Sequence, residues 1–254
     1  MLKSFEVDSL SVRVYASQDD MSTAAAREAN DHLCGVISEQ GSAAAILATG
    51  NSQIQFLEIL LATGEVDWSK VTLFHMDEYL GLDADHSASF RRYMRERVES
   101  RVNPSVFHYL EGDALEPLRE CRRYANLLAA HPIDLCCLGV GENGHIAFND
   151  PPVADFNDPE MVKIVQLDDA CRQQQHGEGH FPTFDAVPQS ALTLTIPALC
   201  QAKKMICLCP EMRKAEVVKR ALQGEISEEC PVTHLRTQSQ CVLFLDQDSA
   251  SLLD

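Results

Sequence analysis

The sequence predicts an α/β fold with a mostly parallel sheet, helices on both of its faces, and a single domain spanning residues 1–254. Short runs rich in apolar and β-branched residues alternate along the chain with longer stretches of helical spacing, which is typical of successive βα units. The chain has 254 residues and is 45% hydrophobic, enough to bury one large core. No stretch rich in Pro, Gly or Ser and no block of charge divides it.

Each predicted strand is a short run with high β-propensity that ends at polar or turn-forming residues. In chain order, strands are expected at 10–15, 43–48, 71–74, 106–110, 133–138, 161–167, 191–196, 203–208 and 241–245. Helices are expected where apolar residues recur every three or four positions. The first contains an alanine run, the third is charged and amphipathic, and the last stops at Gly224. The helices span 21–39, 53–62, 87–98, 115–130 and 211–222.

Composition narrows the class of partner. The formal net charge of −17 argues against nucleic acid or an anionic membrane, since either needs a basic face. An anionic small molecule stays possible, because a few backbone N–H groups and one cation can bind a phosphate in an acidic protein. No apolar run suits a signal peptide or a membrane span of about 20 residues. The ten cysteines form no Cys-x-x-Cys pair, so we expect reduced core thiols in a cytoplasmic protein, not disulfides or a zinc site.

Ligands of such sheets bind beyond the carboxyl ends of the strands, so the loops after strands are where chemistry is expected. The first such loop is Thr49-Gly50-Asn51-Ser52, between a strand and a helix. Glycine permits a crowded or left-handed backbone, and the polar residues can cap the helix while leaving N–H groups free. The loop could therefore hold an anion, or it could be an ordinary capped turn.

The second loop carries two adjacent acids, Asp77 and Glu78, directly after a buried strand. One of them could act as a general base, with its pKa set by partial burial and by the charge of its neighbour. The alternative is a pair of acids that only begins a helix or a loop.

The third loop is 138–152, with the sequence LGVGENGHIAFNDPP. Its G-x-G-x-x-G pattern suggests a dinucleotide site, but the two closing prolines leave little room for the required helix, and the loop lies past mid-chain. What remains is a glycine-lined turn that carries Asn143, His145 and Asp150. Such a histidine, held in one tautomer by polar neighbours, is suited to proton transfer.

Two further features could reach the same edge of the sheet. Lys214 begins a helix after a strand, although a solvated surface lysine is the default interpretation. The polar segment 168–188 holds two histidines and could be a mobile lid or a surface excursion. We place the candidate lid at about 151–190.

The motifs LATGNS, FHMDEYLGL and LGVGENGHIAFNDPP, in this order, resemble the glucosamine-6-phosphate deaminase/isomerase family. The likeness extends from residue 43 to the helix at Lys214 and beyond. It implies a Rossmann-like α/β fold that binds no nucleotide and acts on a small sugar phosphate, a hexosamine 6-phosphate. No metal and no organic cofactor are implied, and a homo-oligomer is compatible with the sequence.

The resemblance also implies roles. Asp77 matches the general base that moves a proton between C2 and C1 of the opened sugar, and His145 matches the histidine that assists ring opening. Asp150 stands where the family usually has a glutamate that partners this histidine, so its carboxylate is set back by about one methylene. Asn143 stands where members have aspartate or asparagine. The ketimine formed by the isomerisation is then hydrolysed to a ketose 6-phosphate and ammonia.

The remaining matches concern substrate and phosphate binding. The loop Thr49, Gly50, Asn51 and Ser52 matches the phosphate loop, Gly144 is expected to lie against the substrate, and Lys214 matches the phosphate-binding lysine. Arg172 is a candidate for the family's phosphate arginine, although the segment after residue 168 does not follow the familiar lid.

Three other functions stay open. A 6-phosphogluconolactonase typically carries Asp-Glu-Arg and Gly-His-Thr, whereas this chain has Asp-Glu-Tyr at 77–79 and Gly-His-Ile at 144–146, which favours the deaminases. A non-catalytic sugar-phosphate-sensing domain could lose Asp77 or His145 and would accompany a DNA-binding module, for which the chain has no room. A deaminase acting on galactosamine 6-phosphate would use the same residues.

Overall fold

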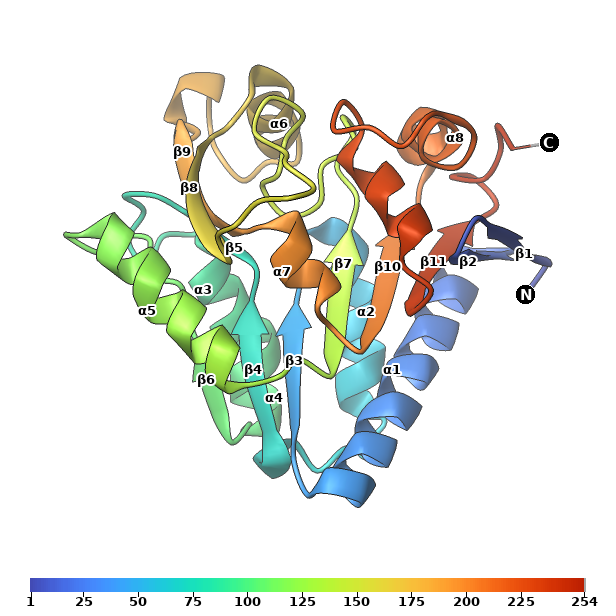
Figure 1. The fold of residues 1–254 in the computed structure, drawn as a ribbon, viewed down its shortest axis with the longest axis horizontal. Coiled ribbons are helices and arrows are strands. Elements are labelled where there is room, and N and C mark those ends of the chain that lie inside the picture. The colour runs from blue at the N-terminus through green and yellow to red at the C-terminus, as the bar shows by residue number, and fades with distance from the viewer. Residues whose placement is uncertain (254) are drawn as a thin grey trace.

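An eight-stranded sheet forms the centre of the structure, a computed structural model that describes residues 1–253 (Figure 1). The strand order is β1-β2-β11-β10-β7-β3-β4-β6. β1 pairs with β2 in antiparallel fashion and the other pairs are parallel, which confirms the predicted mostly parallel sheet. The strands are β1 (Lys3–Val7), β2 (Leu10–Tyr15), β3 (Ala43–Leu47), β4 (Val71–His75), β6 (Val106–His108), β7 (Leu135–Gly139), β10 (Lys204–Cys209) and β11 (Cys241–Asp246).

A second, antiparallel sheet has the order β5-β9-β8 and lies at the upper left in Figure 1. Its strands are β5 (Asp77–Tyr79), β8 (Val162–Gln166) and β9 (Ser190–Leu194). The sequence predicted β8 and β9 but not their separation from the main sheet. β8 and β9 form a separate sheet because they pair with β5 and not with the central strands. β5 has three residues, begins one residue after the end of β4, and pairs Asp77 with Thr193 of β9. So short a strand has too few residues for its alternation to be recognised in sequence.

Helices cover both faces of the central sheet, as predicted. The expected helix at 87–98 begins three residues later and continues through a π-helical turn at Arg95–Glu99, and the one at 211–222 opens with a 3₁₀ turn at Met212–Lys214. The α-helices are α1 (Gln18–Gln40), α2 (Asn51–Ala62), α3 (Phe90–Met94), α4 (Ser100–Val102), α5 (Pro117–Ala130), α6 (Asp169–Gly177), α7 (Ile196–Cys200) and α8 (Ala215–Gln223). No helix in the described part of the chain is long and apolar enough to cross a membrane.

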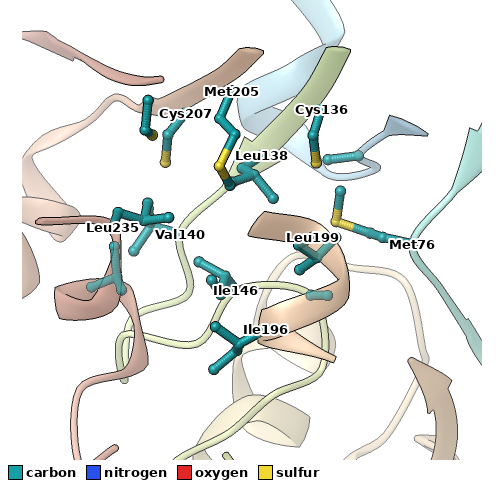
Figure 2. Packing of buried hydrophobic residues seen from close by; sticks show 14 of the residues in the cluster. Met76, Cys136, Leu138, Val140, Ile146, Ile196, Leu199, Met205, Cys207 and Leu235 are labelled. Carbon is teal, nitrogen blue, oxygen red and sulfur yellow. The ribbon is translucent and has the colours of Figure 1, made fainter. Parts of the chain in front are cut away.

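Alternate residues of the strands pack into two cores, one on each face of the sheet. In β3, Ala44 and Ile46 join the core beneath α5, α7 and α8, whereas Ala45 and Leu47 join the core beneath α1 and α2. Figure 2 shows part of the first core, where side chains of β7 and β10 meet those of α7 and of the loop after β7. The neighbours Cys136 and Cys137 belong to opposite cores, so they are packing residues and not a paired ligand set.

A third apolar cluster fixes the segment that was predicted as a lid. The rings of Phe90, Phe148 and Phe181 each lie 5.0 to 5.3 Å from the ring of Tyr79. Val187 and Cys171 of the same segment are buried in this cluster. The segment is thereby packed onto β5 and α3, and it stands beside the carboxyl ends of the central strands.

Candidate active site

A pocket opens beyond the carboxyl ends of β3, β4, β7 and β10, where a parallel sheet is expected to bind its ligand. The open space, including the mouth, is about 880 Å³, within the range of small-molecule sites. The wall consists of the loops that follow the four strands, together with part of the segment around α6. It includes all of Thr49, Gly50, Asn51, Ser52, Asp77, His145 and Lys214.

One end of the pocket is formed by the start of α2. Gly50 caps this helix with a φ of 103°, a backbone conformation that residues with a side chain rarely adopt. The cap makes no side-chain hydrogen bond. The first N–H groups of α2 therefore remain for water or a ligand, and the helix dipole favours an anion there.

Lys214 lies on the same pocket and is 4% exposed, so its interpretation as a solvated surface lysine is wrong. Burial lowers the pKa of its ammonium, and the nearby charge of Arg213 also lowers it. Among residues 1–253, none forms a hydrogen bond or an ion pair with this ammonium. The charges of Glu142 and Glu178 act on this ammonium in the opposite direction, but neither carboxylate pairs with it directly, so the ammonium is available to an anion in the pocket.

Asp77 stands at the other side of the pocket as the first residue of β5, and it is 6% exposed. Burial raises the pKa of its carboxyl well above the ordinary value, and the charge of Glu78 raises it further. Its Oδ1 has no hydrogen-bond partner within residues 1–253. An unpaired carboxylate with a raised pKa is a better proton acceptor than an ordinary aspartate.

Glu78, the acid adjacent to Asp77, has a structural role. The carboxylate of Glu78 is buried and accepts hydrogen bonds from the hydroxyl of Ser89 at 2.8 Å and from the backbone N–H of Arg91 at 2.9 Å. It also accepts from the N–H of Phe90 at 3.2 Å. These bonds tie β5 to the first turn of α3. Of the two neighbouring acids, only Asp77 is left facing the pocket with an unpaired oxygen.

His145, Asp150 and Asn143 form one hydrogen-bonded group. The imidazole Nδ1 lies 2.8 Å from Oδ1 of Asp150, whose side chain is fully buried. The amide of Asn143 donates to the same carboxylate at 2.9 Å, and its oxygen accepts from the backbone N–H of His145 at 3.0 Å. Burial alone would raise the pKa of Asp150, but the hydrogen bonds from His145 and Asn143 outweigh it and lower the pKa. The 2.8 Å separation favours the tautomer with the hydrogen on Nδ1, because a carboxylate can only accept, but the direction of this N–H departs from that of a regular hydrogen bond.

The absence of a side chain at Gly141 leaves the space that the imidazole of His145 occupies. A Cβ on Gly141 would lie 2.2 Å from the ring of His145, so no larger residue fits there. Gly144 has a structural role. Its φ is 96°, and a Cβ at this position would lie 2.7 Å from the sulfur of Cys230, so glycine is required there. Gly144 does not line the pocket. The prediction that Gly144 lies against the substrate therefore has no support in the geometry. Asn143 likewise lies behind the pocket wall.

In the described part of the chain, one group of side chains has the composition of a metal site. His145, Asp150 and Cys171 each offer a ligand atom, and these atoms lie within 4.8 Å of one another. The Asp150 carboxylate is already engaged by the protein, since it accepts from the amide of Asn143 at 2.9 Å and from the backbone N–H of Asp168 at 3.3 Å. We therefore interpret these residues as a hydrogen-bonded support for the imidazole.

The segment around α6 closes one side of the pocket. The backbone N–H of Glu142 donates to the side chain of Gln174 at 3.0 Å, and the hydroxyl of Tyr79 donates to Gln175 at 2.8 Å. These contacts hold the segment against the pocket. The residues of this segment on the pocket wall are Gln174, Gln175, Glu178 and His180.

Arg172 does not line the pocket. Its guanidinium donates to the carbonyls of Phe184 and Val187, both at 3.2 Å, and lies 4.2 Å from the ring centroid of Phe184. It holds its own segment together, so it is not placed to bind phosphate. The sequence did not single out Arg213, which does line the pocket beside Lys214; its only sequence signal was that adjacency.

Comparisons with known proteins show the family and the fold. The model of the family described as glucosamine-6-phosphate isomerases/6-phosphogluconolactonase matches residues 16–244. A glucosamine-6-phosphate deaminase of Bacillus cereus (strain B4264) is 36% identical over 206 residues, which are 81% of this chain and 76% of the relative. A solved structure described as a monomeric glucosamine-6-phosphate deaminase is 31% identical, with a TM-score of 0.87 over 95% of this chain and 99% of that one. A 6-phosphogluconolactonase from Shewanella baltica OS155 shares the fold, with a TM-score of 0.75 over 92% and 96% of the chains at 17% identity.

Proposed function

The chain belongs to the glucosamine-6-phosphate isomerase/6-phosphogluconolactonase family, and we propose that it is a glucosamine-6-phosphate deaminase. It converts glucosamine 6-phosphate to fructose 6-phosphate and ammonia. One observation carries the proposal: a single pocket holds a buried, unpartnered cation at Lys214 and a buried carboxylate at Asp77 with an unpaired oxygen. The first suits a phosphate, and the second suits the removal of a proton from carbon.

The phosphate binds between the start of α2 and Lys214. The N–H groups after Gly50 donate to the phosphate oxygens, with the side chains of Thr49, Asn51 and Ser52 around them. The ammonium of Lys214 supplies the compensating charge. This anchor fixes the sugar chain with its reacting carbons towards Asp77, and such positioning lowers the barrier to proton transfer.

The chemistry needs one base and one proton-transfer group. In the opened sugar the carbonyl at C1 acidifies the C2 proton, which Asp77 removes and returns to C1 on the same face. His145 moves a proton at the ring oxygen during ring opening. Asp150 and Asn143 hold the imidazole in the tautomer with Nε2 free, so they act as positioning residues. Water then hydrolyses the ketimine at C2, releasing ammonia.

Two further properties belong to the proposal. The segment around α6 acts as a lid over the bound sugar, supported by its four residues on the pocket wall. The cytoplasm is the proposed location, supported by ten free cysteines, most of them in the core, since thiols stay reduced there.

The experiment that tests the function is ammonia release from glucosamine 6-phosphate, run beside galactosamine 6-phosphate and 6-phosphogluconolactone. We expect ammonia and fructose 6-phosphate in equal amounts from the first substrate. Turnover of galactosamine 6-phosphate alone would support the proposed reaction but assign a different sugar as the substrate. Lactone hydrolysis without ammonia would assign the chain to the other branch of its family. Binding of a sugar phosphate without any turnover would refute catalysis and favour a sensing domain.

A further inference from the structure

Arg213 has an unusual set of partners. Its guanidinium contacts Glu142 at 3.0 Å, Glu178 at 2.8 Å and Glu211 at 2.6 Å. The three carboxylates come from the glycine loop after β7, from the segment after α6, and from the turn of Arg213 itself. Three carboxylates therefore face two adjacent cations, Arg213 and Lys214, which leaves the group with a surplus of one negative charge.

This surplus lies on the pocket wall that is proposed to bind phosphate. Arg213 precedes Lys214, and both line the pocket together with the loop at Gly50. A phosphate dianion next to Lys214 would be repelled by the carboxylates on Arg213 as long as they stay in place. A guanidinium, by contrast, presents paired N–H groups that match phosphate oxygens. Exchanging one carboxylate for the phosphate would reduce the repulsion and let the guanidinium donate charged hydrogen bonds to the phosphate.

Glu178 is the carboxylate best placed to exchange. Burial alone would raise the pKa of Glu178, but hydrogen bonds with His180 and Arg213 outweigh it and bring the pKa to about 2, so the group is ionised at neutral pH. The carboxylate of Glu178 would retain two other contacts after losing Arg213. These are with the amide of Gln174 at 3.0 Å and the imidazole of His180 at 3.5 Å. It also stands in the lid segment, where a shift needs no movement of the central sheet.

We propose that Arg213 is a second phosphate-binding residue, held by Glu178 while the pocket is empty and transferred to the phosphate of the substrate on binding. The phosphate thereby opens the Arg213–Glu178 bridge and couples substrate binding to the position of the lid. This inference rests on the proposed sugar-phosphate function. The competing explanation is a permanent latch, in which Arg213 only ties the lid to the glycine loop.

The two explanations predict opposite signs for one variant. If Glu178 competes with phosphate for Arg213, then Glu178→Gln frees the guanidinium and tightens phosphate binding. If the bridge is a latch, Glu178→Gln loosens the lid and weakens binding, as does Arg213→Gln. If Arg213 is transferred from Glu178 to the phosphate, Arg213→Gln should weaken phosphate binding about tenfold or more, the usual effect of losing a charge-assisted contact.

The measurement is the dissociation constant of inorganic phosphate for the full chain by titration calorimetry, in the wild type, both single variants and the double variant. We expect Glu178→Gln to tighten binding several-fold, and this gain to vanish in the Arg213→Gln background. A gain that persists in the double variant would mean a general charge effect and would overturn the proposal, as would a loss in Glu178→Gln or no change in Arg213→Gln.

Two controls keep the test decisive. Arg213→Lys keeps the positive charge, so it should retain part of the phosphate affinity even if Arg213→Gln folds poorly. Phosphate binding also needs no turnover, so the result stands apart from the ammonia assay. A wild-type chain that releases no ammonia but shows the expected signs would refute the deaminase and leave Arg213 as an anion-binding residue.

Discussion

Replacing Lys214 by methionine should make the fold more stable and the binding of phosphate weaker. Methionine has similar length and keeps the buried stem packed, but it removes a cation that is 4% exposed and has no ion-pair partner among residues 1–253. Removing an uncompensated buried charge should raise the free energy of unfolding by about 1 kcal/mol. Losing one charge-assisted contact to phosphate costs about 1.5–3 kcal/mol, a rise of roughly ten- to a hundred-fold in KM.

The assay is thermal unfolding of wild type and Lys214→Met with and without inorganic phosphate, followed by KM for glucosamine 6-phosphate. Phosphate should raise the melting temperature of the wild type, since a ligand of the native state stabilises it, and have little effect on the variant. Lys219→Met is the matched control, because Lys219 is exposed on the same helix α8 and should change neither quantity. A destabilised Lys214→Met variant with an unchanged KM would refute the reasoning, since Lys214 would then be a structural residue.

Three other predictions concern the reacting end of the pocket. Asp77→Asn should abolish turnover with little loss of sugar-phosphate binding. Because the folded-state pKa of Asp77 is raised, the wild type loses stability as the pH rises from the ordinary value of 3.8 through the folded-state pKa. The variant should therefore be the more stable protein at neutral pH, and the two should converge below about pH 4, measured by denaturant unfolding. For the same reason the acid limb of kcat/KM should lie above the ordinary aspartate pKa of 3.8. Asp150→Ala should lower kcat/KM about a hundredfold by releasing His145, and destabilise the fold by about 1–3 kcal/mol through the hydrogen bonds left unpaired; an unchanged rate would exclude its positioning role. Gly141→Ala should inactivate the enzyme by displacing the imidazole, whereas Gly35→Ala, with open space around its Cβ inside α1, should keep full activity and gain about 0.5–1 kcal/mol.

The sequence was sufficient to predict which loops meet, but not which side chains face the pocket. Strand-and-helix alternation predicted the parallel sheet, and therefore the edge where its loops gather. The residue pattern alone did not tell Asp77 from Glu78, and only the resemblance to the family selected Asp77; neighbours in a strand point to opposite sides. The side that each takes depends on the pairing of β5 with β9, more than 100 residues away, with Asp77 opposite Thr193.

The arginines show the same limit. The resemblance to the family made Arg172 a candidate for a phosphate-binding arginine, in a segment that does not follow the familiar lid. In the structure, the carbonyls of Phe184 and Val187 take up its guanidinium, so it serves the fold of the segment. Arg213 reaches the pocket because the chain turns sharply after β10, with Glu211 at a φ of 80°. No spacing in the sequence indicates that turn, since glutamate rarely adopts such a conformation.

Three charged residues of the pocket, Lys214, Asp77 and Arg213, lack balanced partners inside the described part of the protein. Among residues 1–253, Lys214 is a buried cation without a direct ion pair, Asp77 has an unpaired carboxylate oxygen, and Arg213 contacts three carboxylates. Each arrangement costs stability in the empty protein, while Glu78, one residue from Asp77, is fully hydrogen-bonded and tied to α3. Under the proposed function, a bound phosphate would pair with Lys214 and a carbon acid would give a proton to Asp77. Part of the free energy that the fold gives up at these positions would then be recovered on binding of a phosphorylated substrate, which would favour such a substrate over an uncharged sugar.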